Sequence, residues 1–115
     1  MRQIAVRTHE GRVVCQRCAV ADGPLTRMRG LLGRSELRAG EGMLLKPASS
    51  VHTFFMRFPI DVVFIDREGH VTRVIRALRP WRVAGSRRAR AVLELPAGAC
   101  ARDEITPGSC LRLTL

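Results

Sequence analysis

Apolar and polar positions alternate along most of the chain, and short β-branched runs are separated by clusters of Gly, Pro, Asp and Ser. A period of two places every second side chain on the same face of a strand. Turn-forming clusters between such runs are typical of strands joined by short connections. The pattern predicts strands over residues 3–8, 12–21, 42–46, 51–57, 60–66, 71–79, 91–98 and 110–115.

Helical spacing is confined to small parts of the chain. Pro24 suits a first helical turn, apolar residues then recur at helical spacing, and Gly33 suits the end of a helix. We therefore expect an amphipathic helix over about 24–33 and a helical turn near 98–104. Because most strands have no helix between them, the sequence predicts a mainly β fold, a compact single-domain sandwich or barrel-like roll over residues 1–115.

Two of the predicted strands contain most of the aromatic residues. The strand 60–66 is apolar on both faces, which is typical of a central strand covered on both sides. Because 51–57 is predicted to be a strand, its side chains should divide between two faces. One face then carries His52, Phe54 and Met56, and the other carries Thr53, Phe55 and Arg57.

The composition, 46% apolar and 26% charged, is that of a soluble globular protein. No run approaches the roughly 18 apolar residues of a membrane span. The first 23 residues carry charges throughout and contain no apolar core of a signal peptide. We therefore expect a cytoplasmic protein with reduced cysteines.

The four cysteines are predicted to be packing thiols. Cys15 and Cys18 form a C-x-x-C within a predicted strand, where positions three apart face opposite sides, so their thiols should diverge. Cys100 and Cys110 are too widely spaced for the second half of a zinc ribbon. A redox or metal role for these cysteines stays open.

The formal net charge of +10 comes almost entirely from arginine. Such a charge favours anionic partners such as nucleic acid, phosphorylated ligands or a membrane surface. A GC-rich coding background, in which arginine fills exposed positions by default, is the alternative explanation. The stretch from Gly69 to Leu93 has no acidic residue, and its Trp81 is either an exposed stacking surface or folded onto the core. The candidate anion-binding residues are Arg73, Arg76, Arg79, Trp81, Arg82, Arg87, Arg88 and Arg90.

The ordered motifs "GLLGRSEL", "GML", "HTFFMRFPIDVVFID", "LELPAG" and "PGS" resemble those of the DUF192 family of small prokaryotic proteins. The likeness covers roughly residues 25–113. It implies a small mainly β sandwich or roll, and it carries no catalytic residues because the family has no defined activity. Members often have Trp where this chain has Phe55, and many relatives look exported.

Three polar residues, His52, Asp61 and Glu94, are embedded in predicted apolar strands. A buried carboxylate is costly unless it has a partner. Asp61, at a strand entrance, is expected to accept backbone N–H bonds, and Glu94 is expected to pair with one of the many arginines. His52 is expected to be a satisfied core or rim histidine, unless the three residues converge on a shared pocket.

The interpretation favoured by these patterns is a non-enzymatic module that binds a small ligand or a protein partner in a Phe-lined cleft. One alternative is a small enzyme that uses His52, Asp61 and Glu94, although no nucleophile elbow is present. A second alternative is binding of nucleic acid or another polyanion. No catalytic residue, metal or cofactor is predicted, and the oligomeric state is open. The residues predicted to line the cleft are His52, Phe54, Phe55, Met56, Phe58, Asp61 and Glu94.

Overall fold

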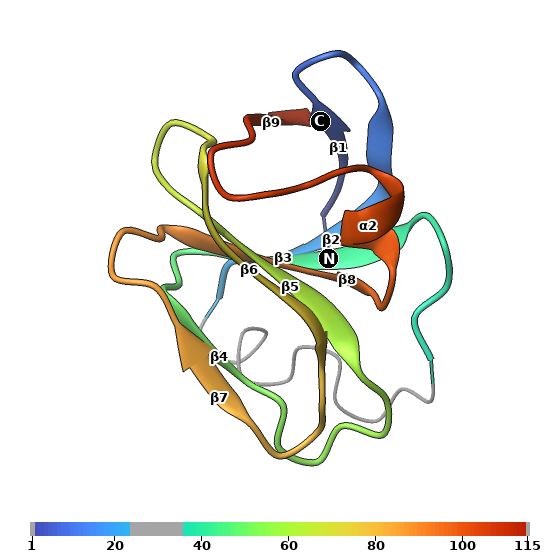
Figure 1. The fold of residues 1–115 in the computed structure, drawn as a ribbon, viewed down its shortest axis with the longest axis vertical. Helices are drawn as coiled ribbons and strands as arrows, with labels where there is room; N and C mark the ends of the chain where they lie inside the picture. Colours follow the sequence, from blue (N-terminus) through green and yellow to red (C-terminus); the bar gives the residue numbers. More distant parts are fainter. Residues whose placement is uncertain (1, 24–35, 115) are drawn as a thin grey trace.

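A computed structural model describes residues 2–23 and 36–114 of the chain. One seven-stranded sheet curls into a half-barrel, and a two-stranded sheet lies at its lower end in Figure 1. This architecture confirms the predicted mainly β fold. The helix expected over 24–33 lies outside the described residues.

The elements follow the predicted order with small changes of boundary. The large sheet has the strand order β6-β5-β8-β3-β2-β1-β9, and all neighbours are antiparallel except β2 and β3. The small sheet pairs β4 with β7. The bounds are β1 Gln3–Thr8, β2 Val13–Ala21, β3 Glu41–Leu45, β4 Ser50–His52, β5 Ile60–Ile65, β6 Val71–Leu78, β7 Val83–Gly85, β8 Ala91–Pro96, α2 Ala99–Arg102 and β9 Leu111–Thr114.

Two predicted segments differ from the structure. The strand expected over 51–57 ends at His52, because the chain turns there and Phe55 adopts a left-handed φ of 67°. The alternation of faces expected from His52 to Arg57 is therefore wrong. The stretch between the predicted strands 71–79 and 91–98 contains β7, whose three residues are too few to show a periodic pattern.

The large sheet is covered on both faces, so it has two apolar cores. β5 is buried at all six positions, as predicted for a strand covered on both sides. One core, which we call the α2 core, contains Val63, Leu93 and Cys100. The other, the β4–β7 core, contains Val62, Phe64 and further residues under the small sheet. Side chains that alternate along β5 and β8 therefore enter different cores.

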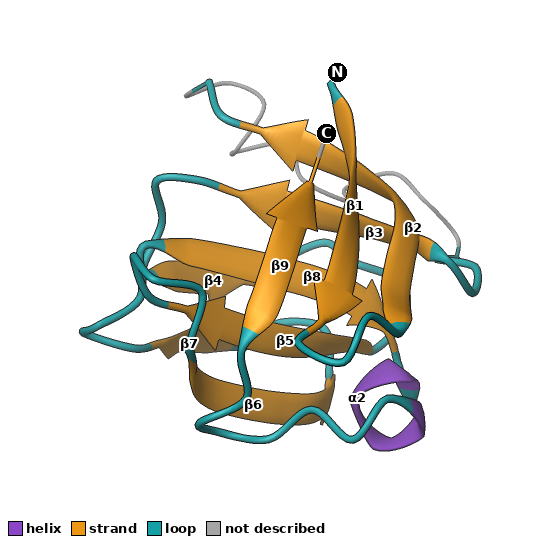
Figure 2. Ribbon diagram, turned by 90° about the horizontal axis from the view of Figure 1, so that it is seen from above, coloured by secondary structure: helices purple, strands orange, loops and turns teal. Residues whose placement is uncertain are grey.

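The curl brings the two edge strands of the sheet together at one corner (Figure 2). The N–H of Val71 at the start of β6 donates to the carbonyl of Ser109, and the N–H of Leu111 at the start of β9 donates to the carbonyl of Gly69. Gly69 has a φ of +90°, and a Cβ there would lie 2.7 Å from the Leu111 carbonyl oxygen. Glycine at this position allows the close approach that partly closes the barrel.

The C-x-x-C motif lies in a β-bulge of β2. Val6 pairs with Cys15 and Ile4 pairs with Cys18, so three steps along β2 oppose two along β1. The bulge turns both thiols into the α2 core, where both residues are fully buried. The expected divergence of Cys15 and Cys18 is therefore wrong, because the extra residue shifts the alternation of faces.

Candidate functional site

Thr53 ties the loop that follows β4 to the loop that precedes β7. Its side chain is fully buried. Its hydroxyl donates to the Arg79 carbonyl at 2.6 Å and accepts the Arg82 N–H at 2.9 Å. Its own N–H donates to the Arg82 carbonyl at 2.8 Å, and its carbonyl accepts the Trp81 N–H at 2.9 Å. Four hydrogen bonds thus hold the two loops as one unit.

The two loops present aromatic side chains in left-handed backbone conformations. Phe55 has a φ of 67° and Trp81 a φ of 66°, which are outliers for bulky residues. The surrounding hydrogen bonds to Thr53 hold this strained geometry. Strain retained in this way is concentrated at binding and catalytic sites in proteins, so the outliers indicate a candidate site.

The exposed rings of Phe54 and Phe55 both contact the ring of Trp81. Phe54 and Trp81 stack with ring centroids 5.8 Å apart and planes at 30°. Phe55 meets Trp81 edge-on at 4.6 Å. The rings remain open to solvent, since Phe55 is 68% and Trp81 55% exposed. Contiguous exposed apolar surface of this kind marks interaction sites.

His52 extends the group at the end of β4. It is exposed, its ring centroid lies 5.0 Å from that of Phe54, and its Nδ1 accepts the Phe54 N–H at 3.3 Å. His52 is therefore an exposed histidine at the rim of the small sheet with one ring nitrogen hydrogen-bonded, as expected for a satisfied rim histidine. We call His52, Phe54, Phe55 and Trp81 the aromatic cluster. It joins residues from both predicted sets, because Trp81 was placed among the anion-binding candidates and the other three among the cleft residues.

Met56 and Phe58, also predicted to line the cleft, lie beneath the loop. Met56 is buried in the β4–β7 core, and the half-buried Phe58 packs against that core. They anchor the loop after β4 from below. The surface available to a partner is formed by the aromatic cluster above them.

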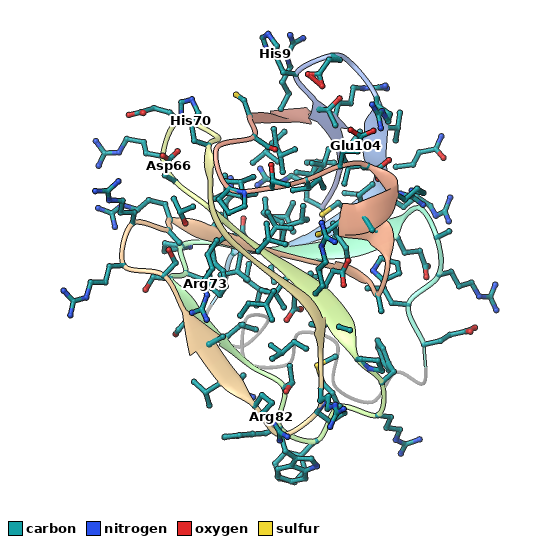
Figure 3. The ribbon with its side chains drawn as sticks, viewed as in Figure 1. His9, Asp66, His70, Arg73, Arg82 and Glu104 are labelled. Atoms are coloured by element: carbon teal, nitrogen blue, oxygen red, sulfur yellow. The ribbon has the colours of Figure 1, made fainter. Side chains whose placement is uncertain are left out.

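The predicted anion-binding arginines are all exposed. Residues 47–60 and 69–93, which include the loops of the aromatic cluster, contain no acidic residue. In the described part of the chain their arginines form no ion pair. Figure 3 shows Arg82 at the opposite end of the molecule from His9. The exposed arginines are Arg73, Arg76, Arg79, Arg82, Arg87, Arg88 and Arg90.

Asp61 is fully buried, and its carboxylate accepts hydrogen bonds from backbone N–H groups. One carboxylate oxygen accepts the N–H of Ala77 at 2.9 Å, at a bulge of β6. The other accepts the N–H groups of Gly98 at 3.1 Å and Cys100 at 2.9 Å, at the start of α2. Backbone N–H partners were predicted for Asp61, and these three bonds join β5 to β6 and α2.

Glu94 is the least satisfied polar group of the described residues. It is buried in β8 opposite Met43 and Val62, which belong to the β4–β7 core. No described residue donates a hydrogen bond to its Oε1. Burial raises the pKa of the Glu94 carboxyl to about 8. The expected pairing with an arginine is wrong, because the register of β8 turns this side chain toward apolar neighbours.

The three polar residues proposed to converge are separated by the sheet. Asp61 pairs with Leu95 and Glu94 pairs with Val62, so the two carboxyl groups lie on opposite faces. His52 is exposed on the small sheet. The geometry brings His52 together with the aromatic residues and leaves both acids buried elsewhere.

Arg87 and Arg88 line a hollow of about 450 Å³ beside the turn between β5 and β6. Asp66 also lines this hollow, so its charges are mixed. Asp66, Glu68 and His70 bring their ligand atoms within 4.8 Å of one another. Oδ1 of Asp66 already accepts the N–H groups of Glu68 and His70 at 2.9 Å, and the bond from His70 is the main cause of a lowered Asp66 pKa. These hydrogen bonds show that Asp66, Glu68 and His70 lie close together because they form the turn between β5 and β6.

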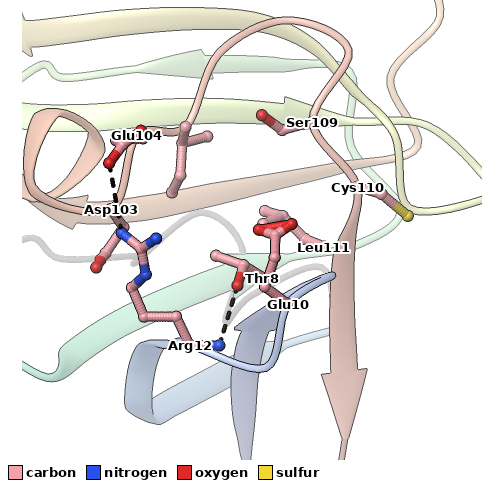
Figure 4. Close-up of a pocket in the computed structure, with 9 residues that line it drawn as sticks. Thr8, Glu10, Arg12, Asp103, Glu104, Ser109, Cys110 and Leu111 are labelled. Carbon is pink, nitrogen blue, oxygen red and sulfur yellow. Dashed lines mark hydrogen bonds and ion pairs between the residues drawn. The ribbon is translucent and has the colours of Figure 1, made fainter.

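Another hollow contains none of the predicted site residues (Figure 4). The Arg12 side chain lies across it, with a guanidinium nitrogen 3.9 Å from a Glu104 carboxylate oxygen. The backbone N–H of Arg12 donates to the Thr8 hydroxyl at 3.0 Å. The volume of about 150 Å³ is below the roughly 300 Å³ at which small-molecule pockets begin. The aromatic cluster is therefore the stronger candidate site.

The buried cysteines pack in the α2 core. A hydrogen bond with Cys18 is the largest cause of a lowered Cys15 pKa, and the same bond raises the pKa of Cys18. Burial raises the pKa of Cys100 to about 12. All three are fully buried, which fits the predicted packing role.

Comparison with known families identifies the chain. Residues 5–113 match the model of the DUF192 family, described as "Uncharacterized ACR". A UPF0127 protein from Thermococcus sibiricus is 33% identical over 94 residues, which cover 77% of this chain and 60% of that relative. The chain thus spans less than two thirds of that relative's length. The chain belongs to the DUF192 family, as its motifs predicted.

Solved structures share the fold over nearly the whole chain. A Novosphingobium aromaticivorans protein of unknown function superimposes with a TM-score of 0.82 and 25% identity, covering 96% of this chain and 83% of its own. A Sinorhizobium meliloti protein, provisionally described as a transcription regulator, superimposes with a TM-score of 0.83 and 25% identity. The match covers 96% of this chain and 92% of that protein. The described residues contain no helix long and apolar enough to cross a membrane.

Proposed function

For this DUF192 chain we propose a non-enzymatic binding function in which the aromatic cluster is the contact surface. The observation that carries the proposal is the exposed ring of Trp81 with the exposed rings of Phe54 and Phe55 packed against it. Aromatic side chains are enriched among the residues that dominate binding energy, because they bury a large area at a low cost in conformational entropy.

The rigidity of the two loops supports the same proposal. Thr53 bonds to three residues of the loop before β7, so the rings are held in place before a partner arrives. Binding then orders few additional groups, which lowers the entropic cost of association. The two buried acids, Asp61 and Glu94, lie on opposite faces of the sheet, which argues against the alternative of an enzyme that uses both in one site.

The test uses Trp81, the only tryptophan of the chain, as its own reporter. Sugars, nucleotides and short peptides are titrated while tryptophan emission and the melting temperature are followed. A ligand of the cluster is expected to shift the emission, and Phe55→Ala is expected to weaken its binding by roughly 30-fold, the effect of losing about 2 kcal/mol at an aromatic anchor.

Val13→Ala is the matched control, because Val13 is also an exposed apolar residue but lies in β2. It should leave the affinity unchanged. A ligand that stabilises the protein with no change in Trp81 emission, and with full affinity for Phe55→Ala, would show that the contact surface lies elsewhere.

A further inference from the structure

We propose that the aromatic cluster binds single-stranded nucleic acid, with unpaired bases stacked on its rings and phosphates neutralised by arginines of the same two loops. This inference rests on the proposed function and specifies its partner. From the sequence, binding in a Phe-lined cleft and binding of a polyanion were separate alternatives. This inference places both at the aromatic cluster.

The charge around the cluster is of one sign. Arg57 belongs to the loop after β4, and Arg79 and Arg82 belong to the loop before β7; all three are exposed. Residues 47–60 and 69–93 contain no Asp or Glu at all. The cations at the cluster therefore face no carboxylate from their own segments, and an anionic partner is the complement of this surface.

The rings supply the second half of the recognition. Phe55 and Trp81 expose more than half of their surface, and Phe54 stacks against Trp81. Base stacking on aromatic side chains contributes about 1–3 kcal/mol per base and tolerates any sequence. Bases paired in a duplex are stacked on one another and are not free to cover these rings, so the geometry favours single strands.

Two other anionic partners fit less well. An acidic peptide would neutralise the arginines but would leave three aromatic rings without a matching surface. A free phosphate group would have the same shortcoming at the cluster. At the hollow beside Arg87 and Arg88, it would also meet the Asp66 carboxylate. Rings and cations in the same two loops are matched by a chain that alternates bases and phosphates.

The inference predicts the strength of each contribution. If Arg57, Arg79 and Arg82 each neutralise one phosphate, log affinity should fall with log salt with a slope of about −2. Trp81→Ala should weaken binding by roughly 5- to 150-fold, which corresponds to one lost stacking contact. Trp81→Phe should retain most of the affinity, because it keeps a stacking ring.

The test measures fluorescence anisotropy of a labelled thymidine oligonucleotide of about 12 nucleotides, which is within the range of single-strand site sizes. An abasic strand of equal length and a duplex are the comparison ligands. We expect the single strand to bind at least tenfold more tightly than either. Arg88→Gln, outside the two loops, should change the affinity less than Arg82→Gln.

Equal binding of the abasic strand would overturn the stacking inference and leave only attraction between charges. Binding of acidic peptides in preference to any oligonucleotide would overturn it as well, while the proposed contact surface would stand. No Trp81 response to any class of ligand would remove both. If Trp81→Ala fails to fold, as judged by its melting temperature, Phe55→Ala replaces it as the variant that lacks one stacking ring.

Discussion

Asp61 and Glu94 occupy neighbouring positions in the ladder between β5 and β8, yet their side chains enter different cores. The sequence could predict backbone partners for Asp61, because a carboxylate after a Pro at a strand entrance commonly accepts such bonds. It could not predict the surroundings of Glu94. Those depend on which strands lie beside β8 and in which register, and such pairings join residues far apart in the chain.

Glu94 is predicted to make the protein less stable as the pH rises. Its pKa is raised from 4.5 to about 8 in the folded protein, so the folded state binds this proton more tightly than the unfolded state. The stabilisation is complete below about pH 4.5 and is lost progressively up to about pH 8. The melting temperature should fall by several degrees across this window through this group alone.

Glu94→Gln, which imitates the protonated carboxyl, should flatten this dependence and raise the melting temperature most at pH 8 and above. Glu10→Gln, an exposed substitution in the turn between β1 and β2, is the control and should follow the wild-type profile. Parallel pH profiles for Glu94→Gln and the wild type would contradict the assignment.

At the scale of elements, periodicity predicted most strands because their residues alternate, but it failed where a local backbone conformation interrupts the alternation. The left-handed Phe55 ends β4 after three residues, and the bulge in β2 turns Cys15 and Cys18 to the same face. Neither the left-handed Phe55 nor the bulge between Cys15 and Cys18 contains a glycine or proline, the residues from which such departures can be predicted. The aromatic cluster depends on the first of these departures, so its geometry could not be derived from strand alternation.

Thr53 is predicted to be the residue that holds the two loops of the cluster together. Thr53→Val keeps the shape of the side chain but removes the bonds to the Arg79 carbonyl and the Arg82 N–H. We expect a loss of about 1–3 kcal/mol in the free energy of unfolding, measured by urea denaturation. Acrylamide should also quench Trp81 more efficiently, because the loop before β7 is released.

Thr106→Val is the control, since Thr106 is an exposed hydroxyl residue next to Ser109 in the turn before β9. It should leave both the stability and the quenching close to wild type. If Thr53→Val leaves the quenching of Trp81 unchanged, the loops are held by contacts other than these hydrogen bonds.

At the scale of the whole molecule, the body is 35 Å long. Arg82, next to Trp81 of the aromatic cluster, and Glu104, which lines the hollow spanned by Arg12, lie toward opposite ends of it (Figure 3). The seven arginines of residues 73–90, which contribute to the net charge of +10, are all exposed. The sequence could not predict that Trp81 would join Phe54 and Phe55. Their contact requires β4 to pair with β7 across about thirty residues of intervening chain.

The most direct test of this account is backbone amide chemical-shift mapping of the protein titrated with the tightest ligand found by the Trp81 screen. The account predicts that the largest changes occur in residues 52–58 and 79–83, which carry the aromatic cluster. Largest changes around Thr8, Arg12 and Glu104 instead, with the cluster unaffected, would contradict its central claim.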